Sequence, residues 1–236
     1  MAELADRILE CLNAVQRERE ARAAQPSWDE RVQAVKVYQQ ERFKRTYADL
    51  LVDPRYAPAA RFFLDELYGP RDFSDRDAQF ARVVPALLTL FSHEVVETVA
   101  TLATLHALSE SLDSAMGRYL DGKHVEADDY VEAWQATAHA DDRERQIALT
   151  LAVGEKLDRF TRRPLLRRSL RLMRGPARTA GLGALQQFLE TGFDAFSAMH
   201  GAQEFLATVS LRERALIAAL FDATAPAADS PLEQLP

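Results

Sequence analysis

The chain has 236 residues, of which 47% are apolar and 28% are charged, the balance of an ordinary globular protein that buries a core. The net charge of −7 argues against a general nucleic-acid-binding protein, which needs excess positive charge to release counterions from phosphates. The single cysteine, Cys11, excludes an internal disulfide bond, and no stretch approaches the about 18 apolar residues of a membrane span. We therefore expect a cytoplasmic protein, and the Ala- and Arg-rich composition favours a bacterial source.

Nearly every segment has the apolar spacing and the start signals of an α-helix. Ser27 and Ser74 are predicted N-caps, because serine side chains accept hydrogen bonds from the first helical N–H groups. The helix expected over 176–200 is apolar almost all round, which predicts a place in the middle of a bundle. In chain order, helices are predicted over 2–24, 27–51, a short stretch between Pro54 and Gly69, 74–91, 92–120, 126–138, 141–160, 164–175, 176–200 and 203–222.

These elements predict a single all-α domain over residues 1–222, a bundle of about nine or ten helices. The sequence contains no alternating strand pattern, no repeat and no linker long enough to separate two domains. Residues 223–236, "ATAPAADSPLEQLP", are predicted to form a disordered C-terminal tail.

Two histidine–carboxylate pairs at helical spacing lie in the long helix over 92–120: His93 with Glu97, and His106 with Glu110. At roughly 100° per residue the pairs point to opposite faces, about 20 Å apart along the axis, so they cannot share a metal ion. The first pair shares its face with threonines and is expected in solvent. The second lies in the apolar sector, where both side chains need partners. A hydrogen bond from His106 to another helix would satisfy it, and this pair is also the best candidate for a ligand-binding site inside the bundle.

No metal centre is predicted. A di-iron carboxylate bundle needs Glu-x-x-His motifs on two helices, and no histidine of the chain has a glutamate three residues before it. Haem needs only one imidazole in an apolar pocket, so ligation by His106 or His200 stays open. No catalytic residue is predicted, because the chain has neither a serine elbow nor a Cys–His pairing signal.

Residues 159–178, "RFTRRPLLRRSLRLMRGPAR", predict a cationic amphipathic helix with one arginine stripe and one apolar stripe. Such a stripe suits an anionic ligand, an anionic lipid surface, nucleic acid or an acidic partner. It can equally dock on the acidic stretch 121–145 of the same chain, and both alternatives stay open. The predicted contact surface, called the arginine surface below, consists of Arg163, Arg167, Arg171, Arg174 and Arg178.

Two motifs, "RFFLDELYGPRDFSDRDAQFARV" over 61–83 and "GLGALQQFLETGF" over 181–193, resemble a family of uncharacterised all-helical bacterial proteins. The similarity runs through most of the chain. The resemblance implies the fold and a bacterial origin, and it implies no activity. Charged side chains around the turn of the first motif either form a structural network or line a site where the turn meets the bundle. They are Asp65, Arg71, Arg76 and Asp77.

Two functions of different classes are consistent with these patterns. The first is a non-catalytic helical protein that binds a partner, or itself as a homodimer, through the arginine surface. The second is a helical-bundle enzyme or carrier that holds a small ligand or haem in an internal pocket near His106 and Glu110.

Overall fold

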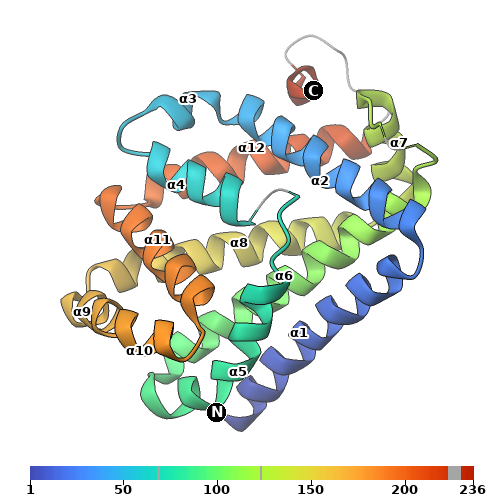
Figure 1. Cartoon of the computed structure of the whole chain (residues 1–236). Helices are drawn as coiled ribbons and strands as arrows, with labels where there is room; N and C mark the ends of the chain where they lie inside the picture. Colours follow the sequence, from blue (N-terminus) through green and yellow to red (C-terminus); the bar gives the residue numbers. More distant parts are fainter. Residues whose placement is uncertain (68–69, 123, 223–229) are drawn as a thin grey trace.

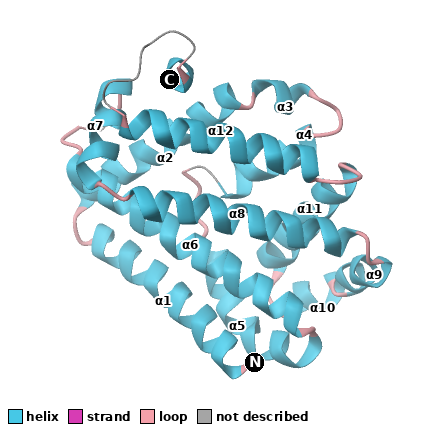
Figure 2. Cartoon of the chain, turned by 180° about the vertical axis from the view of Figure 1, so that it is seen from behind, coloured by secondary structure: helices cyan, strands magenta, loops and turns pink. Residues whose placement is uncertain are grey.

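The computed structural model describes residues 1–67, 70–122, 124–222 and 230–236, and every regular element in these ranges is a helix (Figure 2). The prediction of an all-α fold is therefore confirmed. Within these ranges nine α-helices have nine or more residues, in line with the predicted nine or ten. The elements are α1 (Ala2–Ala23), α2 (Pro26–Thr46), α3 (Ala48–Val52), α4 (Ala57–Phe62), the π-helix η1 (Phe63–Leu67), α5 (Ser74–Leu90), α6 (His93–Tyr119), α7 (Ala127–Thr137), α8 (Ala140–Thr161), α9 (Pro164–Leu172), α10 (Arg174–Thr179), α11 (Gly183–Ala198), α12 (Gln203–Phe221) and the 3-10 helix η2 (Pro231–Gln234).

The 27-residue helix α6 runs through the middle of the molecule and contacts α1, α2, α5, α7 and α8 (Figure 1). Its first half packs Val96 and Ala103 into a core shared with α1 and α5. Its second half packs Met116 into another core, shared with α2, α7 and α12. Because neighbouring helices enclose α6, two of its carboxylates, Glu110 and Asp113, are only 4% and 8% exposed.

Two pairs of helices, α6 with α2 and α11 with α4, approach closely at glycines, and three of these helices line the candidate site described below. A Cβ at Gly117 of α6 would lie 2.4 Å from Cγ2 of Val32, so only glycine lets α2 pack this near. A Cβ at Gly192 of α11 would lie 2.8 Å from the ring of Phe62. This ring belongs to an aromatic core that also contains Phe196, so α11 is held firmly against α4.

Two predicted N-caps are not caps in the structure. The helix α2 begins at Pro26 after Gln25, one residue before the predicted cap Ser27, because proline fits the first turn, where its missing N–H is not needed. Ser74 is the first residue of α5 rather than its cap. Its backbone N–H donates to the carboxylate of Asp72 at 2.8 Å, so the acid performs the capping role predicted for the serine.

The predicted helix boundaries hold within a few residues except in two places. The helix expected over 27–51 is divided into α2 and α3 at Tyr47. The two helices expected over 164–175 and 176–200 are three, because the chain turns at Gly181, whose φ of 68° suits glycine. The helix α11 nevertheless lies among other helices, as predicted, in contact with α4, α5, α8, α9 and α10.

The predicted disordered tail over 223–236 is only partly open to comparison, since 223–229 lie outside the described residues. Residues 230–236 differ from the prediction: Ser230 caps η2 by accepting a hydrogen bond from Leu232, and Leu235 is 6% exposed in the core beside α2 and α12. The carbonyl of Leu235 also accepts a hydrogen bond from Arg45 at 2.7 Å. The buried side chain of Leu235 therefore holds residues 230–236 against α2 and α12.

Helices α9 and α10 form one edge of the molecule, beside α8 and α11 (Figure 1). No residue of α9 is buried, and Leu165 and Leu172 are 73% and 77% exposed. In the part of the chain that the structure describes, no helix is both long and apolar enough to cross a bilayer.

Candidate ligand pocket

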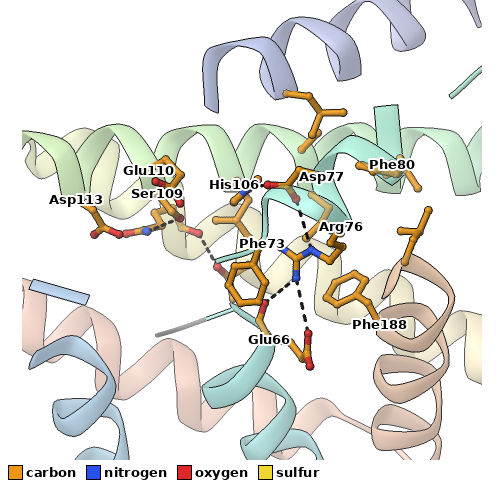
Figure 3. A pocket seen from close by; sticks show the side chains of 18 of the residues that line it. Glu66, Phe73, Arg76, Asp77, Phe80, His106, Ser109, Glu110, Asp113 and Phe188 are labelled. Carbon is orange, nitrogen blue, oxygen red and sulfur yellow. Dashed lines mark hydrogen bonds and ion pairs between the residues drawn. The ribbon is translucent and has the colours of Figure 1, made fainter. Parts of the chain in front are cut away.

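A cavity of about 120 Å³ lies where α1, α2, η1, α5, α6, α8 and α11 meet (Figure 3). Both residues of the candidate pair, His106 and Glu110, line it. We call it the polar pocket. Its polar lining residues are Lys36, Gln39, Glu66, Arg76, Asp77, His106, Ser109, Glu110, Asp113, Gln146 and Thr150.

His106 is held by a partner from another helix, as the sequence predicts. Its Nε2 lies 2.8 Å from Oδ2 of Asp77, and Figure 3 shows the two side chains facing each other across α5 and α6. Asp77 also lies 2.9 Å from Arg19. Burial alone would raise the pKa of Asp77, but the hydrogen bond with His106 and the nearby guanidinium groups lower it overall. Asp77 is therefore an ionised anchor for His106.

Glu110 is ion-paired with two cations from the first two helices. Its carboxylate lies 2.9 Å from Arg22 and 2.7 Å from Lys36, and Arg19 approaches to 3.6 Å. Although burial opposes ionisation, the charges and hydrogen bonds of these partners lower the pKa of Glu110 to about 2. Glu110 and Asp77 together link α1, α2, α5 and α6 through charge.

Asp113 lies about one turn beyond Glu110 on the same face of α6 and behaves differently. Its carboxylate accepts one hydrogen bond, from Nε2 of Gln39 at 3.1 Å. Burial raises the pKa of Asp113, and the negative charge of Glu110 adds to the effect, while Lys36 opposes it. Two acids of one helix are thus driven in opposite directions by their partners.

The guanidinium of Arg76 is stacked between two aromatic rings, next to Glu66 of η1. Its guanidinium carbon lies 4.0 Å from the ring centre of Phe73 and 4.6 Å from that of Phe188 (Figure 3). The nearest carboxylates, Asp77 and Glu66, lie 3.5 and 3.8 Å away, distances of loose ion pairs. Because the rings cover its faces, the guanidinium can interact strongly only along its edge, where its N–H groups point.

The charged groups around the polar pocket are unequal in number. Its lining contains two cations, Lys36 and Arg76, and four carboxylates. Arg19 and Arg22 of α1 reach these carboxylates without lining the pocket. The carboxylates are Glu66, Asp77, Glu110 and Asp113.

Some charged residues around the turn of the first motif form a charge network and also line a site, the two alternatives that the sequence left open. Arg76 and Asp77 line the pocket and also take part in a charge network with Glu66. Arg71 is 60% exposed, lies 3.7 Å from Glu66 and does not line the pocket. Asp65 does not line it either.

The arginine surface does not dock on the acidic stretch 121–145, so this alternative is wrong. Arg163 pairs with Glu94 of α6, while Arg167 and Arg174 pair with acids of α11 at 2.8 and 2.7 Å. Arg171 and Arg178 are exposed and form no ion pair with any described residue. The surface is therefore partly neutralised by the protein's own α6 and α11.

Other predicted ligands lie elsewhere or fit poorly. His93 and Glu97 are exposed, as predicted. Within the described residues no three His, Cys, Asp or Glu side chains converge as a metal-binding group. Of the two candidate haem ligands, His106 has its Nε2 2.8 Å from Asp77, and His200 is exposed at the end of α11.

The cations of α1 and α2 were missed by sequence analysis. A signal for polar contacts of α2 exists: Gln39, which lines the pocket, and Arg42, which pairs with Glu213 elsewhere, occupy the same helical stripe as Val32 and Val35. Such polar residues in an apolar stripe need buried partners. The partner of Gln39 on α6, about seventy residues away in the sequence, could not be deduced from spacing.

Comparison with known proteins adds a family but no activity. The chain matches no curated protein and no solved structure. The profile of a family described as a domain of unknown function, DUF8198, matches residues 18–227, which agrees with the predicted resemblance to uncharacterised proteins. This match covers most of the sequence, from α1 past the end of α12, so the chain belongs to the DUF8198 family.

Proposed function

We propose that the protein binds a small anionic ligand in the polar pocket, near His106 and Glu110. The single observation that carries the proposal is the convergence of buried charged side chains from α1, α2, α5 and α6 on a space that no side chain fills. Burying charges is unfavourable unless they are paired. A core that served only stability would do better with apolar side chains, so these charges favour a binding role.

Arg76 is the residue that we expect to hold the anion. Its faces are fixed by Phe73 and Phe188, and its Nη1 donates to the backbone carbonyl of Glu66 at 3.1 Å. Its Nε lies in a loose ion pair with Asp77, and its Nη2 has no partner among the described residues, so this edge is left for a carboxylate. A guanidinium binds a carboxylate through two parallel N–H groups. Asp113, once protonated, adds a hydrogen-bond donor on the same wall.

Thermal unfolding with hexanoate tests this function. Hexanoate at ten times its dissociation constant should raise the unfolding midpoint of the wild type by about 4 °C. Arg76→Gln should abolish the shift. Arg71→Gln is the matched control, since Arg71 neighbours the same Glu66 but lies outside the pocket, and it should respond like the wild type. An equal response of all three proteins, or no response of any, would refute the proposal.

A second candidate function is contact with an anionic partner through α9. Arg171 of α9 and Arg178 of α10 carry charge toward solvent, and Leu165 and Leu172 expose apolar area on α9. Cationic amphipathic helices of this type lie on anionic lipid surfaces. Co-sedimentation with phosphatidylglycerol vesicles tests it: wild type should bind, Arg171→Glu/Arg178→Glu should not, and equal behaviour would sink it. We also propose that the protein is cytoplasmic, comes from a bacterium and forms a homodimer.

A further inference from the structure

A second cavity, about 300 Å³ in volume, adjoins the polar pocket and lies among α5, α6, α8, α9, α10 and α11. Its lining contains no charged residue. We call it the apolar cavity. Eight of its lining residues also line the polar pocket, among them Leu102, Leu105, Phe188 and Leu189. Seven of the eight side chains are apolar, and the other is Thr150, so the two spaces adjoin along one mostly apolar boundary, called the shared wall below.

Four polar side chains line the apolar cavity, of which Ser169 is exposed and the other three donate to backbone carbonyls. The hydroxyls of Thr98 and Thr150 donate to backbone carbonyls of their own helices at 2.8 Å. The amide of Gln186 donates to the carbonyl of Leu170 at 2.6 Å. A buried water needs two to four polar partners, so this cavity offers no stable place for ordered water.

Size and polarity together indicate what would fill the apolar cavity. An engineered apolar cavity of about 150 Å³ in another protein stays dry and binds benzene. The present cavity has about twice that volume. The present cavity opens to the surface, since Leu90, Met173 and Leu189 of its lining are 68%, 42% and 37% exposed, and the atoms that line it lack dispersion contacts on one side. An apolar chain restores these contacts.

We propose that the ligand is an amphipathic carboxylate, whose head group lies in the polar pocket and whose hydrocarbon chain fills the apolar cavity. This inference rests on the function proposed above and adds the class of ligand. The shared wall of Leu105, Phe188 and Leu189 is where head and chain would meet. The outer wall of the cavity is thin, since α9 supplies Leu166 and Leu170 without burying any residue, and this wall is where we place the entry of the chain.

Calorimetric titration with carboxylates of increasing length tests the inference. Affinity should rise about fourfold for each added methylene, so decanoate should bind on the order of 100-fold more tightly than hexanoate. Equal affinity of the two acids would overturn the inference while leaving the proposed function intact. If neither acid binds, the proposed function fails as well.

A cavity-filling substitution locates the chain. Leu170→Trp adds volume at the cavity wall and should cut the affinity for decanoate to about that for hexanoate, with hexanoate binding unchanged. Leu172→Trp is the matched control two residues away, on a side chain that is 77% exposed, and it should bind both acids like the wild type. Equal decanoate affinity in the two variants would place the chain elsewhere and overturn the inference. Thermal unfolding of both variants establishes that they fold.

Discussion

Arginines gather in two regions of the molecule, around the polar pocket and on the arginine surface. Their ion pairs differ in strength because the two regions differ in exposure to water. Arg22 and its partner Glu110, which lines the pocket, have side chains that are 3% and 5% exposed and lie 2.9 Å apart. Arg167 and Asp194 at the edge lie 2.8 Å apart but are 45% and 51% exposed. The geometry is nearly the same, yet water screens only the second pair. The density of arginine in a sequence therefore says little about where charge matters energetically.

The two regions also differ in whether the charged side chains surround an unfilled space. At the edge, Arg163, Arg167 and Arg174 meet acids of α6 and α11 one to one. Inside, cations and carboxylates are buried together around a space that no side chain fills. Only the internal region combines buried charge with a cavity, which is why we place the ligand there.

Removing one buried acid should give the largest effect. Glu110→Gln leaves Arg22 with only the half-exposed Asp29, 3.4 Å away, and removes the acid that lies 2.7 Å from Lys36, so the free energy of unfolding should fall by about 3–5 kcal/mol. Urea denaturation at pH 7 measures this change. A loss below about 1 kcal/mol would show that the pocket is as well solvated as the surface.

Acid should weaken the internal cluster in a defined pH range. The pKa of Glu110 is lowered to about 2 from the usual 4.5, so its contribution to stability is present above pH 4.5. The contribution is lost as the pH falls from 4.5 toward 2, an effect on the order of 3 kcal/mol. Denaturation of wild type and Glu110→Gln at several pH values measures it. The difference between the two proteins should shrink in this range, and a constant difference would contradict the assignment.

The contribution of Asp113 to stability should depend on pH in the opposite direction to that of Glu110. Burial raises its pKa, so its ionised form is less favourable in the folded protein, and its contribution is best at low pH and declines as the pH rises past 3.8. Asp113→Asn keeps an acceptor for Gln39 without the charge and should raise the free energy of unfolding at pH 7 on the order of 1 kcal/mol. A clear destabilisation in the same denaturation assay would mean that Asp113 is needed as an anion.

The smallest effect is expected at the edge. Arg167→Gln removes a half-exposed ion pair with Asp194 and should change the free energy of unfolding by less than about 1 kcal/mol. Raising the salt concentration should reduce even that difference, because exposed charges are screened. A loss comparable with that of Glu110→Gln would erase the distinction between the two regions.

The sequence predicts most of the fold, because each helix carries its own apolar spacing. The long helix over 92–120 is α6 within one residue at either end, since Ser92 and the loop after Leu120 mark its limits locally. The break at Gly181 was missed because the apolar pattern continues through it. The docking of Leu235 was missed because its partners on α2 and α12 lie far away in the sequence.

The site was predictable only in part. An apolar sector that contains His106 and Glu110 indicates that both need buried partners. The identity of those partners depends on tertiary packing: Asp77 and Arg22 come from helices 29 and 88 residues away. The two cavities are gaps between helices, and no pattern within a single helix encodes a gap.

Native mass spectrometry with decanoate tests the central claim most directly. Wild type and Leu172→Trp should each carry one decanoate, and Leu170→Trp and Arg76→Gln should remain largely free of it at the same concentration. One bound molecule that depends on both Arg76 and the space beside Leu170 is what an internal amphipathic site predicts. Equal loading of all four proteins, or several molecules per chain, would contradict it.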